Sequence, residues 1–452
     1  MHWMGSSTID PQSASGPGSV IVVGAGIVGT CCALHLQRRG FAVTLIDRAG
    51  PGEQCSFGNG GNLGYASSVP LATPGIWRRA PSMLFDPDAP LRIAWTQLPR
   101  LAPWLARFVA ASAPSRVADI ADARASLLRR LYDGYAPLIA GAGAQDLIHR
   151  GGLLYVWESE NAFRRAEPII AMRRRGGATM RLLRGDEARE LAPALTARVT
   201  RAAFAPEVGQ VVNPLRLTQT LAAAFARSGG TVLREEVTGF LQHGVSVQGV
   251  TTHSGAHRTD RLVIAAGAWS GRLLEKLGWR VPLEAERGYH AMIARPGIDL
   301  RVAVVSADRS IGATPMEHGV RIVGITELAG LDRAPDYRQA ERITRLAKGL
   351  LPGLAIEGAV PWMGHRPSLP DSLPVLGSLP GRRNVLLAFG HDHVGLALAG
   401  ITGELVTELA LGETPCVDLA PFRPDRFART RRRAATAPLR SAAPATPMTQ
   451  TP

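Results

Sequence analysis

The feature that most constrains the fold of this chain is a glycine-rich turn between a short apolar strand and a helix. Residues 20–23 are all valine or isoleucine, a run typical of a buried strand. Residues 27–39 have the pattern of a helix that ends at Gly40, and residues 41–46 have the pattern of a second strand. This order forms a βαβ unit, so we expect a parallel sheet with a right-handed crossover.

The turn itself reads Gly24-Ala25-Gly26-Ile27-Val28-Gly29, a GxGxxG motif. Gly24 permits the tight turn, Gly26 lets the backbone approach a pyrophosphate, and Gly29 lets the helix pack closely on the strand. The helix N-terminus offers free N–H groups and a positive dipole end to the phosphates. Asp47 stands 23 residues after Gly24, where such folds place the acid that binds a ribose. The motif predicts a dinucleotide site without distinguishing FAD from NAD.

A loop of small residues follows the second strand and reads Cys55-Ser56-Phe57-Gly58-Asn59-Gly60-Gly61-Asn62-Leu63. Small side chains let backbone amides approach a second phosphate and a ring system, so this loop favours a flavin dinucleotide. Further along, residues 81–141 are predicted to be helical. Strands are expected at 152–158, 231–234, 262–266, 283–294, 311–325 and 385–388, and helices at 215–227, 337–350 and 394–411.

Composition argues against several other classes of protein. The net charge of +14 comes almost entirely from arginine, and part of it lies in a low-complexity C-terminal tail that we expect to be solvated, with no nucleic-acid partner. Four cysteines without paired spacing argue against a disulfide framework or a metal site and favour a cytoplasmic protein. The first residues lack the apolar core of a signal peptide, and we find no uncharged apolar run long enough for a membrane span.

Later motifs connect the chain with a known family. They are Ala265-Ala266-Gly267-Ala268-Trp269, Gly288-Tyr289, Trp362-Met363-Gly364-His365-Arg366-Pro367 with Pro370-Asp371-Ser372-Leu373-Pro374, and Phe389-Gly390-His391-Asp392-His393-Val394-Gly395-Leu396. With the GxGxxG unit and the small-residue loop, they make residues 19–427 resemble the FAD-dependent D-amino-acid oxidase superfamily, specifically its bacterial D-amino-acid dehydrogenase small-subunit group. The string Glu286-Arg287-Gly288-Tyr289-His290 resembles the hydroxyproline-type branch.

This resemblance implies an α/β fold, with a Rossmann-like FAD-binding domain and an inserted α+β substrate domain. The FAD-binding domain would comprise residues 19–80, 205–275 and 355–427, and the substrate domain residues 81–204 and 276–354. Residues 1–18 and 428–452 would be disordered tails.

The resemblance also implies which residues contact the cofactor. In the family the turn at Ala266 lies against the cofactor, the backbone at Val237 holds the adenine, and the last glycine-rich segment opens a helix that points at the flavin. The expected contacts are Gly24, Ala25, Gly26, Ile27, Val28, Gly29, Asp47, Arg48, Ser56, Asn59, Gly60, Gly61, Asn62, Val237, Ala266, Gly267, Trp269, Gly390, His391, His393, Val394, Gly395 and Leu396. No histidine occurs between residues 52 and 64, and Cys416 lies beyond the last helix, so we expect non-covalent FAD and no metal.

For the substrate, the resemblance implies that Arg366 binds a carboxylate and that Tyr289 lies over the pocket. A planar guanidinium can hold a carboxylate through two parallel hydrogen bonds. A neutral amine would pass its Cα hydrogen to the flavin as hydride, and water would convert the imine to a 2-oxo acid. We therefore expect oxidative deamination of a small D-amino acid, with orientation as the main task of the protein and no histidine as base.

We expect a D-amino-acid dehydrogenase that passes electrons to a quinone or another acceptor, and two alternatives stay open. The chain could be an oxidase or dehydrogenase of glycine, sarcosine or a cyclic imino acid such as D-proline or D-hydroxyproline. It could also be a non-catalytic flavin-binding subunit of a heteromeric dehydrogenase, although the presence of Arg366 and Tyr289 argues against that reading.

One segment suggests contact with the inner face of the membrane. Its apolar residues recur at three- and four-residue spacing: Leu98, Leu101, Trp104, Leu105, Phe108 and Val109, with Trp77, Phe85 and Trp95 just before them. Arg100 and Arg107 fall mostly off this face, so the segment predicts an amphipathic helix. Such a face either packs on the core of the domain or lies on anionic lipid, where a reduced flavin would have access to quinone.

Overall fold

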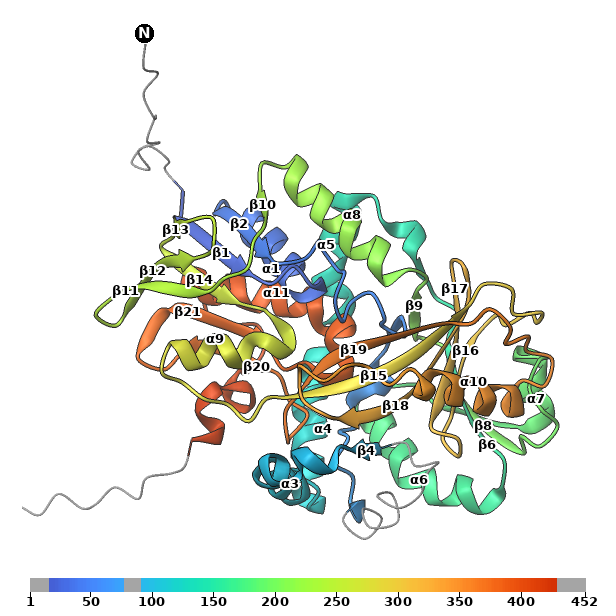
Figure 1. Cartoon of the computed structure of the whole chain (residues 1–452). Coiled ribbons are helices and arrows are strands. Elements are labelled where there is room, and N and C mark those ends of the chain that lie inside the picture. The colour runs from blue at the N-terminus through green and yellow to red at the C-terminus, as the bar shows by residue number, and fades with distance from the viewer. Residues whose placement is uncertain (1–15, 77–90, 429–452) are drawn as a thin grey trace, which may run out of the picture.

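The computed structural model describes residues 16–76 and 91–428, which form two main β-sheets with helices packed around them (Figure 1). Residues 1–15, 77–90 and 429–452 lie outside the described residues. The predictions for most of the two tails, and for Trp77 and Phe85, therefore have no structural counterpart here.

Six strands form the sheet that carries the glycine-rich turn, in the order β10-β2-β1-β14-β21-β20. Their bounds are β1 (Ser19–Val23), β2 (Ala42–Asp47), β10 (Thr231–Arg234), β14 (Arg261–Ile264), β20 (Val375–Leu379) and β21 (Arg382–Phe389). The first five strands in this order are parallel, and β20 is antiparallel to β21. The predicted βαβ unit is confirmed, with α1 (Ile27–Arg38) as its crossover helix.

Four helices share one apolar core beside this sheet: α1, α5 (Leu131–Ala142), α8 (Pro214–Arg227) and α11 (Gly395–Leu411). Two glycines let α5 and α11 cross at close range, because a Cβ on Gly134 would lie 2.3 Å from the backbone nitrogen of Ile401. A Cβ on Gly400 would in turn lie 2.7 Å from the backbone of Gly134. This packing fixes the position of α11, whose N-terminus reaches the cavity described below.

The segment Asp392–Leu411, which includes α11, is the one helical stretch of the described chain with the length and apolar composition of a membrane span. Within the fold, however, 72% of the most apolar stretch of this segment is buried. The protein core therefore accounts for the apolar character of this helix.

The larger sheet has the order β19-β15-β18-β17-β16-β6-β8-β7, and β4 pairs with β18. Its bounds are β4 (Leu91–Ile93), β6 (Leu153–Trp157), β7 (Arg181–Arg184), β8 (Arg201–Ala205), β15 (Glu284–Ile293), β16 (Ala303–Ser306), β17 (Ile311–Met316), β18 (Gly319–Leu328) and β19 (Val360–Ser368). Ile343 and Leu350 of α10 (Arg338–Leu350) pack into its core. In Figure 1, α10 lies beside the larger sheet in the right-hand half of the molecule.

Two three-stranded sheets and five more helices complete the described fold. The sheets are β11 (Gly239–His243), β12 (Ser246–Thr251) and β13 (Ala256–Arg258), and β3 (Asn62–Leu63), β9 (Gly209–Val211) and β5 (Ile148–His149). The helices are α3 (Leu98–Ala111), α4 (Pro114–Leu128), α6 (Glu160–Arg175), α7 (Gly185–Leu191) and α9 (Ser270–Lys276). The helices predicted at 215–227, 337–350 and 394–411 are confirmed to within one residue at each end.

Two segments belong to a different part of the fold from the one predicted. The expected boundary at residue 355 assigned β19 to the FAD-binding domain, but β19 pairs along its whole length with β15 in the larger sheet. The range 81–204 was expected to form the substrate domain, but α5 within it packs on α1, α8 and α11 in the core of the six-stranded sheet. Both assignments depend on contacts between residues that are distant in the sequence.

The amphipathic helix is α3, and its apolar face lies against the protein. Leu101 and Trp104 are buried and pack with Leu328 of β18, while Leu105 and Phe108 are half-buried against the same cluster. Val109 is 41% exposed. Packing on the core, one of the two expected alternatives, therefore accounts for Leu101 and Trp104. Trp95, just before the helix, is 59% exposed, and membrane contact stays a prediction.

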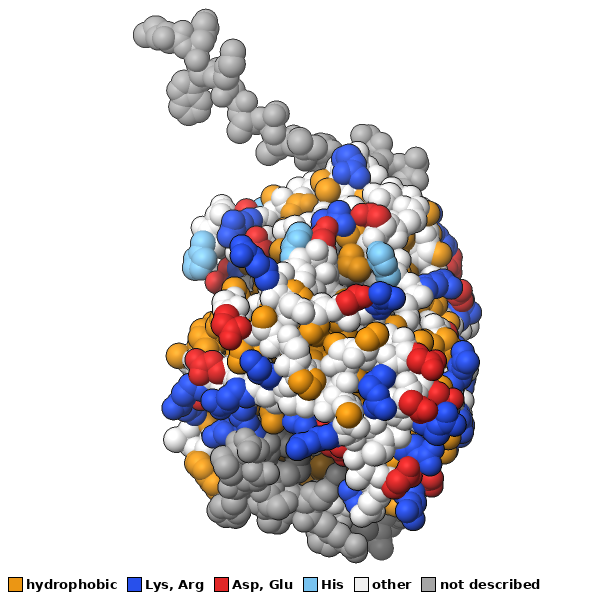
Figure 2. Space-filling view, turned by 90° about the vertical axis from the view of Figure 1, so that its right-hand side faces the viewer, with side chains coloured by type: hydrophobic (Ala, Val, Ile, Leu, Met, Phe, Trp, Pro, Cys, Tyr) orange, Lys and Arg blue, Asp and Glu red, His pale blue; other side chains and the backbone are white. Residues whose placement is uncertain are grey.

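The surface carries both signs of charge. On the face shown in Figure 2, basic and acidic side chains are interspersed. Arginines pair with carboxylates at several places, for example Arg216 with Asp146 at 3.0 Å and Arg175 with Asp122 at 3.1 Å. Much of the basic charge is therefore paired locally with acidic side chains.

Candidate active site

The glycine-rich turn has the geometry that its sequence predicts. Gly24 adopts φ +108°, and a Cβ there would lie 2.5 Å from the carbonyl oxygen of Ala265. A Cβ on Gly29 would lie 1.8 Å from the carbonyl oxygen of Gly24, which no side chain permits. Gly26, in contrast, has only the Ser56 hydroxyl nearby, at 3.4 Å. The turn is therefore closed toward the sheet and open on the side where a phosphate would approach.

Asp47 ends β2 next to this turn and both of its oxygens accept backbone hydrogen bonds. Oδ2 accepts from the amide of Ala25 at 2.7 Å, and Oδ1 accepts from the amide of Ala49 at 2.9 Å. Burial raises the pKa of Asp47 although both of these hydrogen bonds favour its charged form. Its side chain lines a cavity at the end of the parallel strands, where the ribose of a dinucleotide is expected.

This cavity has a volume of about 400 Å³ and extends from the glycine-rich turn to the start of α11. Fifteen of the predicted cofactor contacts line it: Gly24, Gly26, Ile27, Val28, Asp47, Arg48, Ser56, Asn59, Val237, Ala266, Gly267, Trp269, His391, Gly395 and Leu396. Helix N-termini meet it at α1 and α11, which suits an elongated ligand with anionic groups. Ser56 Oγ accepts from the amide of Ile27 at 3.0 Å, so this hydroxyl lies at the N-terminus of α1.

The other eight predicted contacts are not among the lining residues of this cavity: Ala25, Gly29, Gly60, Gly61, Asn62, Gly390, His393 and Val394. Gly61 adopts φ +81°, and a Cβ there would lie 2.6 Å from the carbonyl oxygen of Val211. Gly390 adopts φ +80°, and a Cβ there would lie 2.4 Å from the Leu369 side chain. These two glycines therefore allow close packing within the protein, and their contact with a flavin stays a prediction.

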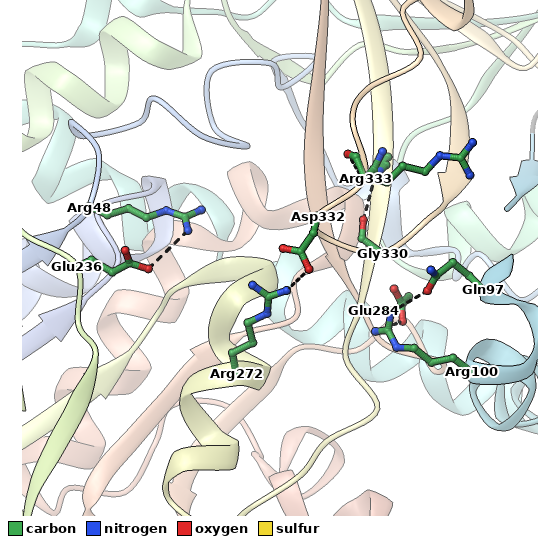
Figure 3. A network of polar contacts seen from close by, with 10 residues as sticks. Arg48, Gln97, Arg100, Glu236, Arg272, Glu284, Gly330, Asp332 and Arg333 are labelled. Atoms are coloured by element: carbon green, nitrogen blue, oxygen red, sulfur yellow. Dashed lines mark hydrogen bonds and ion pairs between the residues drawn. The ribbon is translucent and has the colours of Figure 1, made fainter.

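Several lining residues were not predicted, and some of them are ionisable. They include Glu235, Glu236, Arg272, Lys276, His365 and Asp392. Arg48 stacks over the Trp269 ring at 4.2 Å and lies 3.9 Å from Glu236 (Figure 3). Arg272 pairs with Asp332, which belongs to the loop between β18 and α10. Glu235 and Glu236 follow β10, and Arg272 and Lys276 belong to α9, so no sequence motif marks these four. His365 and Asp392 lie within the late motifs but were not predicted as contacts.

The loop that carries Asp332 is held by a fully buried arginine. Arg287 donates to the carbonyl oxygens of Gly330 at 2.9 Å and Ala334 at 3.1 Å, and also to that of Arg333. Beside this loop, Arg100 of α3 donates to Glu284 at 3.1 Å and to Gln97 at 3.2 Å (Figure 3). The loop between β18 and α10 is thus held to β15 by Arg287 and to α9 by the pair of Arg272 and Asp332.

The small-residue loop is anchored to the larger sheet by three consecutive carbonyl groups. Arg321 donates to the oxygens of Phe57 at 3.0 Å and Asn59 at 2.6 Å, and His290 Nδ1 lies 3.2 Å from the oxygen of Gly58. Trp362 stacks on His290, with their ring centroids 4.9 Å apart. Burial lowers the pKa of His290 to about 3, so this histidine is neutral and Nδ1 carries the hydrogen toward Gly58.

A cluster of charged side chains adjoins the cavity where Cys55 and Asp392 line it. Glu286 of β15 is buried, and its Oε1 accepts from Arg366 at 3.2 Å, from Thr326 at 2.9 Å and from Nε2 of His393. The cross-strand register places Arg366 directly opposite Glu286. His393 Nε2 also lies 3.5 Å from Asp392. Arg366 was predicted at this site, whereas its partner Glu286 was not assigned a role.

Comparison with known proteins agrees with this geometry. A family model described as FAD dependent oxidoreductase matches residues 19–409. The chain belongs to this FAD-dependent oxidoreductase family. It is 36% identical over 417 residues to a D-amino-acid oxidase of Bradyrhizobium diazoefficiens, covering 90% of this chain and 98% of the relative. It is 31% identical over 425 residues to a D-amino acid dehydrogenase of Paramagnetospirillum magneticum, again covering 90% and 98%.

The same fold occurs in solved structures of similar length. The crystal structure of glycine oxidase from Geobacillus kaustophilus matches with a TM-score of 0.70 at 24% identity, covering 90% of this chain and 98% of that one. The expected α/β fold with an FAD-binding part and a substrate part is confirmed. Membership of the dehydrogenase small-subunit group stays a prediction, because the relatives carry both oxidase and dehydrogenase names.

The cavity residues fit FAD, the cofactor of this family. The glycine-rich turn and the N-terminus of α1 would hold the pyrophosphate, Asp47 the ribose, and Val237 the adenine. The start of α11, with Gly395 and Leu396, would lie against the flavin, where a helix N-terminus favours negative charge.

Tyr289 does not lie over the substrate site, and this expectation was wrong. Its side chain is 1% exposed, donates to Glu327 at 2.7 Å and accepts from the amide of Asp336 at 3.1 Å. Burial and Glu327 raise the pKa of Tyr289 to about 12. Strand side chains alternate between faces, so Glu286 and His290 point toward the FAD side of β15, whereas Arg287 and Tyr289 point away.

Two of the histidines near the motifs are neutral: His391 is buried and His365 is half-buried. His391 lies 2.9 Å from the hydroxyl of Thr402, and burial lowers its pKa to about 3. Burial also lowers the pKa of His365 to about 4, where its ring packs edge-on against Trp269. His393 differs from them because it contacts two carboxylates, Glu286 and Asp392.

The potential ligand atoms of Glu286, Asp392 and His393 lie within 4.8 Å of one another, a spacing that a metal ion could use. Arg366 donates into the same carboxylate, however, and a guanidinium so close opposes a divalent cation. The guanidinium therefore argues against a metal at this cluster, and the absence of a metal stays a prediction.

Proposed function

We propose that this protein uses FAD to oxidise a small D-amino acid to an imine, which water then converts to a 2-oxo acid and ammonia. The observation that carries this proposal is the position of Arg366 beside the FAD cavity. Within the described residues its guanidinium donates only through NH1, to Glu286, so Nε and NH2 are available for a substrate carboxylate. Its side chain is 21% exposed, which suits a group that meets a small ligand.

The residues of this chain would mainly hold and orient the substrate. Bound FAD accepts two electrons and the Cα hydrogen, and this is the chemistry that the cofactor supplies. Arg366 would fix the carboxylate through charge-assisted hydrogen bonds, and burial of the surrounding cluster would keep water from competing for them. The names of the two sequence relatives support an amino acid of D configuration as the substrate class.

The electron acceptor belongs to the proposal as well. Sequence analysis favoured a dehydrogenase that uses quinone or another acceptor, partly because of the apolar face of α3. That face packs against Leu328, so it no longer supports lipid contact. The 36% identical relative is named an oxidase, so molecular oxygen should be tested as an acceptor alongside quinone.

The experiment is anaerobic reduction of the purified, FAD-loaded protein. Bleaching of the flavin spectrum is followed with matched D- and L-amino acids, glycine, sarcosine and D-proline. We expect D-enantiomers to reduce the flavin faster than L-enantiomers, and a clear L preference would refute the proposal. Turnover by the single chain separates an enzyme from a non-catalytic subunit. Peroxide formation compared with reduction of an artificial dye then assigns the acceptor.

A further inference from the structure

Glu286 is hydrogen-bonded on one side only. Its side chain is 4% exposed, yet Arg366, Thr326 and His393 all donate to Oε1. Oε2 has no hydrogen-bond donor within the described residues. Glu286 also lies close to Cys55, which lines the cavity, so its free acceptor oxygen offers a position for a donor from a ligand.

The guanidinium of Arg366 lies next to the carboxylate of Glu286. Its guanidinium lies over Gly288, where a Cβ would come within 2.0 Å of Cζ. Gly288 is therefore needed at this point of β15, because any larger residue would displace the guanidinium. With NH1 directed at Glu286 Oε1, the other donors of Arg366 make no hydrogen bond within the described residues and belong to a guanidinium that touches this carboxylate.

We propose that Glu286 and Arg366 together recognise the two charges of an amino-acid zwitterion, with Glu286 Oε2 accepting from the substrate ammonium group while Arg366 binds the carboxylate. The bound ammonium group would release one proton to solvent before the neutral amine is oxidised. This inference rests on the proposed function and adds a specificity-determining residue to it. The ammonium and the carboxylate of an α-amino acid are attached to one carbon, so a binding site for both needs an anion and a cation in direct contact. The cross-strand pair of β15 and β19 provides that arrangement.

The surrounding charges keep Glu286 ionised for this role. Burial alone would raise its pKa, but His393 and Arg366 outweigh burial and lower the pKa to about 2. Asp392 faces the same group, and burial together with Glu286 raises its pKa. Arg124 of α4 attracts Asp392 in turn, and Cys55 completes the titratable groups around Glu286. Glu286 is therefore the ionised acid of this cluster, and Arg366, Thr326 and His393 hold its carboxylate in place.

A consequence is that a ligand with a carboxylate but no amine binds weakly. It gains the contact with Arg366, but it leaves Glu286 without its ligand partner and adds a second anion beside it. A 2-oxo acid product has this composition. Glu286 would therefore favour the amino acid over its product at the same site.

The test uses two unreactive probes, 2-aminoisobutyrate and isobutyrate, with the FAD-loaded full chain. They differ only in the amine, and 2-aminoisobutyrate has no Cα hydrogen to lose. Calorimetry on the wild type should show at least about 10-fold tighter binding of 2-aminoisobutyrate, as expected for one charge-assisted hydrogen bond. Glu286→Gln should reduce this preference to about 2-fold or less, with normal FAD content.

Glu284→Gln is the matched control, since Glu284 is a buried acid two residues earlier on β15 that pairs with Arg100. It should keep the wild-type preference. Equal binding of both probes by the wild type would overturn the inference while leaving the proposed function intact, even if Glu286→Gln failed to fold. A preference that survives in Glu286→Gln would overturn it too. If the wild type bound neither probe, the proposed function itself would fail.

Discussion

Replacing Gly58 with alanine should weaken FAD binding, because Trp362 occupies the space that a side chain would need. An added Cβ would lie 1.7, 2.2 and 2.4 Å from three atoms of the Trp362 ring, well inside ordinary contact. Either the tryptophan must leave its stack on His290, or the loop must move away from the hydrogen bonds that His290 and Arg321 make to it. Overpacking of this kind costs about 1 to 3 kcal/mol.

If overpacking raises the free energy of the FAD-binding conformation by this amount, FAD should bind about 5- to 150-fold more weakly. The assay is titration of the apoprotein with FAD, followed by flavin fluorescence. Gly60→Ala is the control in the same loop, because the nearest atom to a Cβ there is 3.9 Å away. Adding Trp362→Leu to Gly58→Ala should restore much of the affinity. Wild-type affinity in Gly58→Ala, or equal losses in the two alanine variants, would refute this steric reasoning.

Three further predictions concern the substrate, the cofactor linkage and pH. Arg366→Lys keeps the positive charge but loses the planar guanidinium that forms two parallel hydrogen bonds. KM should therefore rise by about 30- to 150-fold, equivalent to roughly 2 to 3 kcal/mol, while FAD content stays normal. Unchanged steady-state kinetics would mean that another group binds the carboxylate. Acid precipitation should release all flavin as FAD into the supernatant, whereas a yellow pellet would indicate a covalent bond, with Cys55 in the cavity wall as the first candidate. Burial lowers the pKa of His290 and His391 to about 3 and that of His35 to about 4, so below pH 6.5 the unfolded chain binds protons that the folded chain does not. Stability should therefore fall as pH drops from about 6.5 toward 4, by at most about 4 kcal/mol per pH unit for three histidines, and thermal melting at several pH values that shows no such fall would contradict this account.

The local chemistry of the cofactor site could be predicted from the sequence. Gly24, Gly29 and Asp47 act within one βαβ unit, so their spacing along the chain determines their spacing in space. The positive φ of Gly24 and the contact of Gly29 with the turn are local steric requirements that only glycine meets. For the same reason the strands and helices of this unit were predicted to within a residue or so of their observed bounds.

The substrate side depended on tertiary structure. Alternation along β15 indicates that Glu286 and Tyr289 lie on opposite faces, but the sequence does not tell which face meets FAD. The pairing of β15 with β19 makes that choice and brings Arg366 opposite Glu286, across 80 residues of chain. His393 reaches the same carboxylate from 107 residues away, through the packing of α11 on α5.

The apolar face of α3 illustrates the same division. Its periodicity predicts a helix with one apolar side, and the helix is present. The same periodicity suits either a protein core or a lipid surface, because both remove apolar side chains from water. Only the contact of Leu101 and Trp104 with Leu328 of β18 decides between them, and that contact joins segments more than 200 residues apart. The sequence alone therefore determined which side chains had to be buried, and the tertiary structure determined what buries them.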